Sequence, residues 1–169
     1  MLELVALRGR DDLVDQVFAP AIHGLWPTFM MHDPVAELYF EALQFEAMGF
    51  GAWRDTAFAV VKPERPDVAV GRAFTVAFAW SGVPGREALP ATGWDGVIRW
   101  AAEDHALGRA PDALSALEIT LLHSHRGIGG SAVVLDAMRH CAAERGLQHM
   151  VAPVRPTGKV AEPLASMQD

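Results

Sequence analysis

The chain is poor in several residue types, and each shortage excludes a class of protein. Its 169 residues include one cysteine, Cys141, so no internal disulfide can form and a reducing compartment is expected. No apolar run is long enough to cross a bilayer, and residues 1–10 lack the basic-then-apolar pattern of a secretory signal. We therefore expect a cytoplasmic protein that has no membrane partner.

Basic residues are also scarce relative to acidic ones. There are 14 Lys and Arg against 21 Asp and Glu, which gives a formal net charge of −7 at pH 7. Nucleic acids and anionic membranes bind clustered Lys and Arg, so the charge balance argues against both as main partners. The chain is 51% hydrophobic, which is enough for a folded core. A single domain over residues 1–169 is expected.

Apolar periodicity and breaker residues divide the chain into helices and strands. A terminal strand–helix–strand unit implies a parallel pair with a right-handed crossover, and an earlier hairpin implies antiparallel strands. We therefore predict an α/β (α+β mixed) fold, in which a mixed, partly antiparallel sheet is flanked by helices on both faces. The expected elements are a strand at 2–7, a helix from Asp11 or Asp12 to about Gly24, a helix from Asp33-Pro34 to Gly49 or Gly51, a hairpin of 55–62 and 67–80, a loop at 81–93, a helix at 94–108, a strand at 115–122, a helix at 131–145 and a strand at 147–154.

The most informative segment is the glycine-rich turn at residues 126–131, which reads RGIGGS and lies between a predicted strand and a predicted helix. Such a turn presents backbone N–H groups at a helix N-terminus, where the helix dipole favours negative charge. The turn is interpreted as a seat for a phosphate or pyrophosphate. The alternative is that its glycines only permit a tight connection. It is not a Walker loop, since no Gly-Lys-Ser/Thr follows, and it ends in Ala132 where a Rossmann fingerprint has glycine.

The segment Arg126–Ser131 resembles the acyl-CoA-binding signature of the GNAT superfamily of N-acyltransferases. That signature is Gln or Arg, two residues, Gly, one residue, then Gly or Ala, and Ser131 departs from its last position. The predicted strands at 115–122 and 147–154 are similar to the family's central strand and to the strand that splays away from it. Further motifs are similar to those of a group of actinobacterial GNAT-like proteins: Trp80–Gly82, Leu89-Pro90, Gly93–Asp95, Leu114–Glu118 and Val154–Thr157.

The resemblance implies an N-acyltransferase that uses acetyl-CoA or another acyl-CoA. The acyl group would pass to an amine of a small molecule by direct attack on the thioester. A non-catalytic acyl-CoA-binding sensor or interaction module is the alternative. The cofactor-binding residues that the resemblance implies are Thr120, Leu121 and Leu122 along the pantetheine arm, and Arg126, Gly127, Ile128, Gly129, Gly130 and Ser131 around the pyrophosphate.

Glu118, on the predicted central strand, is the candidate catalytic base, acting directly or through water. A carboxyl buried in an apolar sheet has a raised pKa, which suits that task; a solvated or salt-bridged strand residue is the equally weighted alternative. The family's usual acid is a tyrosine after the splayed strand, but the single tyrosine, Tyr39, lies far upstream and is expected to pack in the core, as is Cys141. His123 and His125 flank Ser124 just before the turn and lack the partners of a metal site, so no metal is expected.

The resemblance also sets an expectation for the end of the sheet. The superfamily carries a further helix and two strands after the splayed strand, whereas this sequence ends at Asp169. We therefore expect a sheet that lacks the last strands, in a fragment, a reduced variant or a chain completed by a second subunit. An unpaired sheet edge invites pairing, so a homodimer is expected. The loop at 81–93, bordered by tryptophans, is expected to form one wall of the acceptor site.

Overall fold

The computed structural model describes residues 2–26, 30, 32–127, 129–154 and 161–162. Within them the chain forms a five-stranded sheet in which every strand lies beside its neighbour in the sequence. Each of the first four strands is antiparallel to its neighbours among them, and the last runs parallel to the fourth, as predicted. The strands are β1 (Glu3–Ala6), β2 (Phe58–Lys62), β3 (Arg65–Phe78), β4 (Ala113–Leu121) and β5 (His149–Val151).

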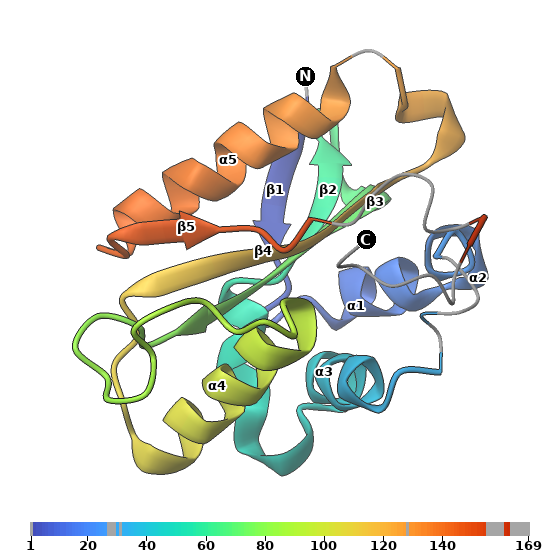
Figure 1. Cartoon of the computed structure of the whole chain (residues 1–169). Helices are drawn as coiled ribbons and strands as arrows, with labels where there is room; N and C mark the ends of the chain where they lie inside the picture. Colours follow the sequence, from blue (N-terminus) through green and yellow to red (C-terminus); the bar gives the residue numbers. More distant parts are fainter. Residues whose placement is uncertain (1, 27–29, 31, 128, 155–160, 163–169) are drawn as a thin grey trace.

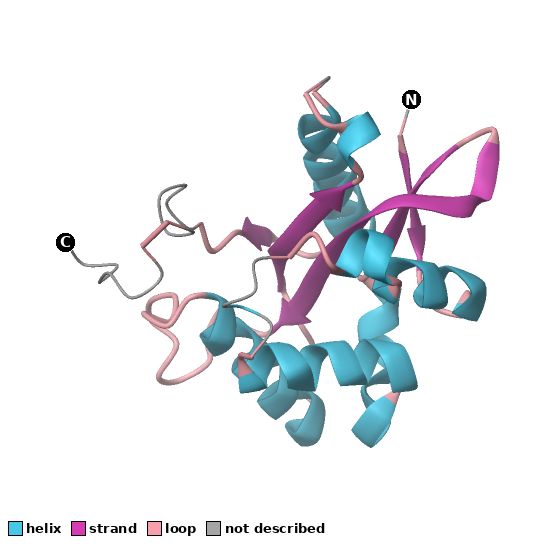
Figure 2. Cartoon of the chain, turned by 90° about the vertical axis from the view of Figure 1, so that its right-hand side faces the viewer, coloured by secondary structure: helices cyan, strands magenta, loops and turns pink. Residues whose placement is uncertain are grey.

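Helices cover both faces of the sheet, which confirms the predicted layering (Figure 1). One helix, α5, lies on one face, and the remaining α-helices lie on the other. Figure 2, turned by a quarter turn, shows the strands between these two helical layers. The helices are α1 (Asp11–Phe18), α2 (Pro20–His23), α3 (Pro34–Phe45), α4 (Trp94–Leu107) and α5 (Gly130–Glu144), and 3₁₀ turns are present at η2 (Ala47–Asp55) and η3 (His123–His125).

Two apolar cores result, one on each face of the sheet. The side chains of β3 alternate between them, so that Phe74 and Phe78 belong to the larger core under α1, α3 and α4. Ala73 belongs to the smaller core under α5, together with Val134 and Met138. The cores hold β4 between two packed helical layers.

The first helical segment is shorter than predicted. A helix from Asp11 or Asp12 to about Gly24 was expected, but α1 ends at Phe18. Pro20 is incompatible with a helical residue before it, so Ala19 is extended and a new helix begins at Pro20. The N-cap position of α1 is occupied by Arg10, and neither Asp11 nor Asp12 caps the helix.

The second helical segment begins as predicted and ends early. Asp33 is the N-cap of α3, and its Oδ1 accepts hydrogen bonds from the backbone N–H groups of Val35 and Ala36 at 2.8 and 3.3 Å. The helix ends at Phe45 instead of at Gly49 or Gly51, because Glu46 takes the left-handed conformation with φ +49°. The chain then continues as η2.

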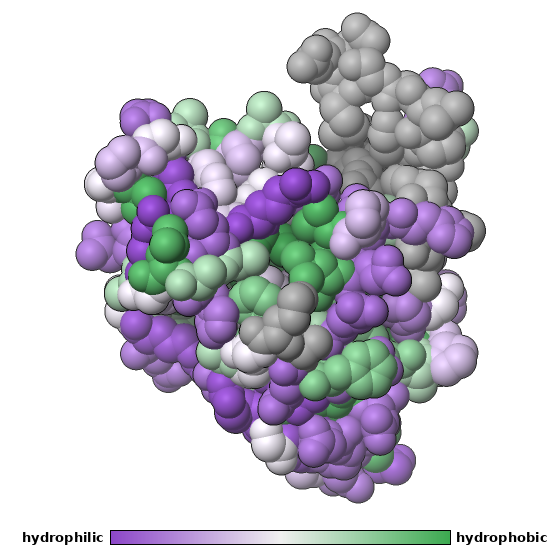
Figure 3. Space-filling view, turned by 90° about the horizontal axis from the view of Figure 1, so that it is seen from below, coloured by the Kyte–Doolittle hydropathy of each residue, from purple (hydrophilic) through white to green (hydrophobic). Residues whose placement is uncertain are grey.

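Hydrophilic groups predominate on the face seen from below, with apolar groups in smaller areas between them (Figure 3). Exposed large apolar side chains in the described part of the chain include Phe45 and Leu107, at the ends of two helices. No helix among the described residues combines the length and the apolar character that a membrane span needs.

Candidate functional site

A cleft of about 460 Å³ lies where the end of β4 meets the turn into α5. Leu25 and Trp26, which follow α2, form its other wall. Six of the residues predicted for the site line the cleft: Glu118, Thr120, Leu121, Arg126, Gly127 and Ser131. Leu122, Gly129 and Gly130 adjoin them in the sequence without lining the cleft, and Ile128 lies outside the described residues.

The N-terminus of α5 opens onto this region without a side-chain cap from the described residues. Gly129 is the N-cap, and its carbonyl accepts the first helical hydrogen bonds, from the N–H groups of Ala132 and Val133. The N–H groups of Gly130 and Ser131 precede those bonds, and such groups bind anions at helix N-termini. The turn therefore has the donors that a phosphate needs.

The two glycines at this helix start are required for different reasons. Gly129 has φ +77° and a side chain built on it would meet no atom within 4 Å, so the backbone is open to an approaching group. Gly130 packs tightly, since a Cβ there would lie 2.9 Å from Leu121 Cδ1. The structural explanation of the turn thus holds for Gly130, while Gly129 leaves the helix end accessible.

Arg126 is held beside the end of β4. Its Nε donates a hydrogen bond to the carbonyl of Leu121 at 2.8 Å. This contact fixes the direction of the side chain and leaves the guanidinium among the residues that line the cleft. A fixed cation beside uncapped helix amides makes the cleft favourable for a doubly charged phosphate group.

The edge of β4 that faces β5 is open over most of its length. β5 pairs only with Ala113, Leu114 and Ser115, and beyond them the described residues provide no strand on that side. An extended ligand with amide groups can bind such an edge as an added strand does. The open stretch leads from the Ser115–Val151 pair to the turn at 126–131.

A β-bulge turns Glu118 toward the larger core. The pairing of β3 with β4 passes from Phe74↔Glu118 to Thr75↔Ala116, so Leu117 is the extra residue. Ser115 lies opposite Val76, and Val76 and Phe74 face the same core. Glu118 and Ser115 therefore share one face of the sheet.

Glu118 is buried in a bidentate ion pair with Arg72. Nε of Arg72 lies 2.7 Å from Oε1 of Glu118, and Nη2 of Arg72 lies 3.1 Å from Oε2. The side chain of Arg72 is 0% exposed and that of Glu118 is 6% exposed. The Thr120 hydroxyl also donates to Oε1. Burial raises the pKa of Glu118 above its ordinary value, and Arg72 opposes that shift. A carboxylate has about four acceptor sites and three are used, so one remains on Oε2.

This geometry matches the salt-bridged alternative for Glu118, and it also places the carboxylate in the wall of the cleft. The two descriptions are compatible, because an ion-paired carboxylate with a free lone pair can still accept a proton. The structure itself assigns no catalytic role.

Arg72 is the site residue that sequence reasoning missed. Its guanidinium lies within 4.8–5.8 Å of four aromatic ring centroids, those of Phe18, Trp26, Phe40 and Phe74. Nη1 also donates to the Val17 carbonyl at 3.2 Å and to His23 Nδ1 at 2.9 Å. A lone arginine inside the apolar run 67–80 was the signal that could have revealed it, since buried charges need partners.

His23 completes this group as a hydrogen-bond acceptor. A guanidinium only donates, so Nδ1 accepts and the proton of the neutral ring is on Nε2. Burial, and then the charge of Arg72, lower the pKa of His23. The ring is therefore neutral near pH 7 and orients the far side of the guanidinium.

Tyr39 packs in the core, as predicted. The side chain is fully buried and its hydroxyl donates to the Thr75 carbonyl at 2.7 Å. Burial raises the pKa of Tyr39 well above its ordinary value, so it holds its proton. Cys141 is half-buried and packs against the smaller core.

The two histidines before the turn lie in η3. His123 is exposed, and His125 Nδ1 is 2.9 Å from the Ser124 hydroxyl. Across the described residues, no group of three or more His, Cys, Asp and Glu side chains is arranged to hold a metal ion.

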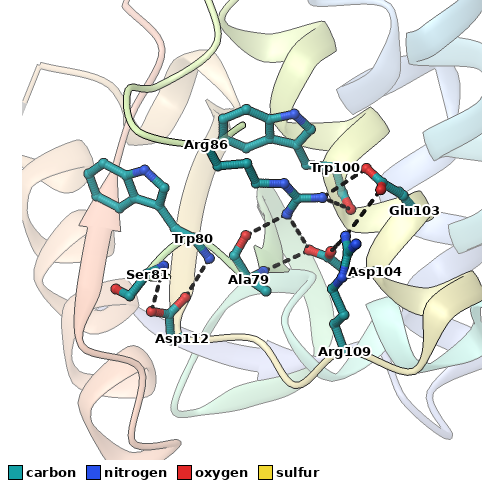
Figure 4. A network of polar contacts seen from close by, with 9 residues as sticks. All are labelled: Ala79, Trp80, Ser81, Arg86, Trp100, Glu103, Asp104, Arg109 and Asp112. Carbon is teal, nitrogen blue, oxygen red and sulfur yellow. Dashed lines mark hydrogen bonds and ion pairs between the residues drawn. The ribbon is translucent and has the colours of Figure 1, made fainter. Parts of the chain in front are cut away.

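Carboxylates anchor the loop at 81–93 at its start and at Arg86 (Figure 4). Asp112 accepts the backbone N–H groups of Trp80 and Ser81 at 2.6 and 3.0 Å. Arg86 is buried, donates to Asp104 at 2.8 Å and to Glu103 at 3.0 Å, and lies 4.7 Å from the Trp100 ring centroid. Trp100 therefore stacks on a cation as well as packing against the larger core.

Comparisons with known proteins find relatives in sequence and in fold. No protein-family profile matches the chain. The arginine N-acetyltransferase avaD of Aspergillus versicolor is 26% identical over 166 residues, which are 95% of this chain and 55% of that protein. The chain thus spans about half the length of this curated relative.

Two solved structures have related folds. The loading GNATL domain of CurA from Lyngbya majuscula superposes with a TM-score of 0.60 at 15% identity, over 99% of this chain and 71% of that one. An aminoglycoside N-acetyltransferase in complex with CoA is more distant, with a TM-score of 0.49 at 13% identity over 97% and 82% of the two chains.

The parallel β4–β5 pair and the turn into α5 are features that the sequence and its resemblance at Arg126–Ser131 implied. The narrower likeness to actinobacterial GNAT-like proteins stays a prediction. The shared architecture confirms the wider likeness at the level of the fold: the chain has the GNAT fold.

Proposed function

We propose that the chain is an acyl-CoA-dependent N-acyltransferase, which transfers an acetyl or other acyl group to an amine of a small molecule. The observation that carries this proposal is the cleft, in which Glu118 lies beside an uncapped helix N-terminus and Arg126. The related arginine N-acetyltransferase supports the reaction class and makes arginine the first amine to test.

In this proposal the acyl-CoA follows the open edge of β4. Its pyrophosphate lies at the N-terminus of α5, where the N–H groups of residues 128–131 donate to it, with Arg126 and Gly127 at its border. Its pantetheine amides pair with backbone groups of Thr120, Leu121 and Leu122, as an added strand does. The thioester then lies near Leu117 and Glu118.

The reaction is a direct substitution at the thioester carbonyl. The amine nitrogen attacks the carbonyl carbon, the C–N bond forms, the C–S bond breaks and the CoA thiolate takes a proton from solvent. Glu118 accepts the amine proton, directly or through water, at the free site on Oε2. The bulge frees the backbone N–H of Leu117 from ladder pairing, so that it can stabilise the oxyanion.

Calorimetric titration with acetyl-CoA, using CoA and NAD as controls, tests the cofactor. We expect acetyl-CoA and CoA to bind and NAD not to bind. Gly129→Glu should abolish binding, because it places a carboxylate at the anion seat. Gly146→Glu is the matched control: it lies at the other end of α5, also has positive φ and also has open space around it. Equal affinity in the two variants would remove the turn from the site.

Turnover with a panel of amines, arginine included, tests the reaction. We expect Glu118→Gln to lower kcat by roughly 10²–10⁴-fold and to remove the rise of kcat with pH that deprotonation of the Glu118 carboxyl causes, while acetyl-CoA affinity is kept. An unchanged rate and pH profile in Glu118→Gln would show that Glu118 only pairs with Arg72. Binding without turnover of any amine would refute the transferase activity.

A further inference from the structure

A second, smaller pocket of about 170 Å³ lies where β4 and β5 separate. The anchored loop, the first turn of α4 and the residues that follow β5 form its walls. Among the described residues of its lining, Ser115 has the one polar side chain and none is ionisable. The apolar walls include Leu89, Pro90, Val97, Val151 and Pro153.

Ser115 is buried without a hydrogen-bond partner. Its exposed fraction is 0%, and its Oγ finds no donor or acceptor among the described residues. A buried hydroxyl in this state is destabilising, and such groups in folded proteins are nearly always satisfied. The pocket therefore presents one unsatisfied hydroxyl inside an apolar wall, which is the pattern of a subsite for a ligand.

The pocket continues the path of the proposed acyl-CoA. Ser115 pairs with Val151 in the last ladder contact before the strands separate, and it shares its face of the sheet with Glu118. Leu117 is two positions after Ser115, which corresponds to about 7 Å along a strand. An acyl chain that leaves a thioester near Leu117 and follows β4 toward its start reaches the Ser115 hydroxyl.

The walls favour an acyl group over the amine. A primary amine is a cation near pH 7, and a cation needs a carboxylate that this lining does not contain. An acyl chain is apolar and fits the remaining walls. A chain with one oxygen can in addition satisfy Ser115.

The pocket is preformed by fixed backbone. Arg86 and Asp112 hold the loop that carries Leu89 and Pro90 (Figure 4). Pro90 packs closely against Gly96 in α4, since a Cβ added to Gly96 would lie 2.4 Å from the Cβ of Pro90. A rigid wall of this kind discriminates between ligands by size and by hydrogen bonding.

We propose that this pocket is the acyl-specificity subsite, and that it selects a short acyl group longer than acetyl, with an oxygen that hydrogen-bonds Ser115 Oγ. The inference rests on the proposed function. The donor class is a short hydroxyacyl or oxoacyl thioester, and the chemistry of transfer is unchanged.

The test compares acetyl-CoA, butyryl-CoA and 3-hydroxybutyryl-CoA, with one amine, by kcat/KM and by calorimetric titration. We expect 3-hydroxybutyryl-CoA to exceed butyryl-CoA roughly 3- to 10-fold, the value of one hydrogen bond. Ser115→Ala should bring the two donors to equal kcat/KM. Ala152→Leu, at an exposed residue of the same lining, should reduce the kcat/KM of both longer donors relative to acetyl-CoA.

Each remaining outcome is decisive. A wild-type chain that binds and uses acetyl-CoA but rejects both longer donors overturns the subsite and leaves the proposed function intact. A preference for the hydroxyl that survives Ser115→Ala overturns the role of Ser115. Failure of all three donors to bind overturns the proposed function, and the subsite with it.

Discussion

Replacing Arg72 by methionine should destabilise the fold more than any surface arginine can. Arg72 is 0% exposed and donates to both oxygens of Glu118, to the Val17 carbonyl and to His23. Methionine keeps much of the side-chain volume but leaves Glu118 with a buried charge and no cation. Removing one member of a buried ion pair costs about 3–5 kcal/mol.

The assay is chemical denaturation followed by a thermal scan. For a chain of this size, 1 kcal/mol corresponds to a shift in Tm of roughly 2–4 °C, so a loss of roughly 6–20 °C is expected. Arg139→Met is the matched control, because Arg139 makes an ion pair with Asp136 at the same distance of 2.7 Å, with side chains that are 61% and 74% exposed. Exposed pairs contribute about 0–1 kcal/mol. Similar losses in the two variants would refute the reasoning from burial.

The loss of unfolding free energy that Arg72→Met causes should also depend on pH. Without the cation, burial raises the pKa of Glu118 further, because only desolvation and the Thr120 hydrogen bond then act. A carboxyl whose folded-state pKa lies above the unfolded value contributes stability below the unfolded pKa and loses it as pH rises through the folded pKa. The difference in unfolding free energy between wild type and variant should therefore be smaller at pH 5 than at pH 8. A constant difference would show that Glu118 is solvated in the variant.

Three further predictions follow from single contacts. Tyr39→Phe should cost about 1 kcal/mol, the value of its hydrogen bond to Thr75, and should leave the pH dependence of acyl transfer unchanged; a shifted profile would make Tyr39 catalytic. Asp33→Ala should cost about 1 kcal/mol in denaturation, since it removes the cap of α3; no loss would mean that the cap is redundant. His23 has a lowered pKa, so it contributes stability above its unfolded pKa that is lost as pH falls through the folded pKa. His23→Gln should therefore show a flatter loss of unfolding free energy below pH 6.5, and an equal slope would contradict the neutral tautomer.

Local sequence patterns predicted most of the helices and strands, because apolar periodicity and breaker residues within each segment determine which element it forms. The hairpin at 58–78, α4 and the β4–α5–β5 unit all follow from apolar periodicity with Gly or Pro at their ends, and the structure confirms each of them. The break at Pro20 was also readable, since a proline restricts the residue before it. The early end of α3 was not, because Glu46 adopts positive φ without being glycine.

The residues around Glu118 were not predictable from local pattern, because its partner lies 46 residues away in the sequence. The sequence shows an arginine and a glutamate, each within an apolar strand, and either could have been solvated. Only the register of β3 against β4 places Arg72 opposite Thr120 and beside Glu118. The turn at 126–131 could be predicted from the sequence, because the backbone N–H groups that it offers to an anion belong to consecutive residues.

The bulge at Leu117 decides whether the proposed site exists as one unit. In a regular strand, residues three apart face opposite sides of the sheet, so Ser115 and Glu118 would lie in different cores. The extra residue shifts the alternation by one position and brings both side chains to the face that carries the anchored loop. A base on one face and an acyl pocket on the other could not serve a single thioester. The proposed chemistry therefore depends on a backbone irregularity that composition and periodicity do not reveal.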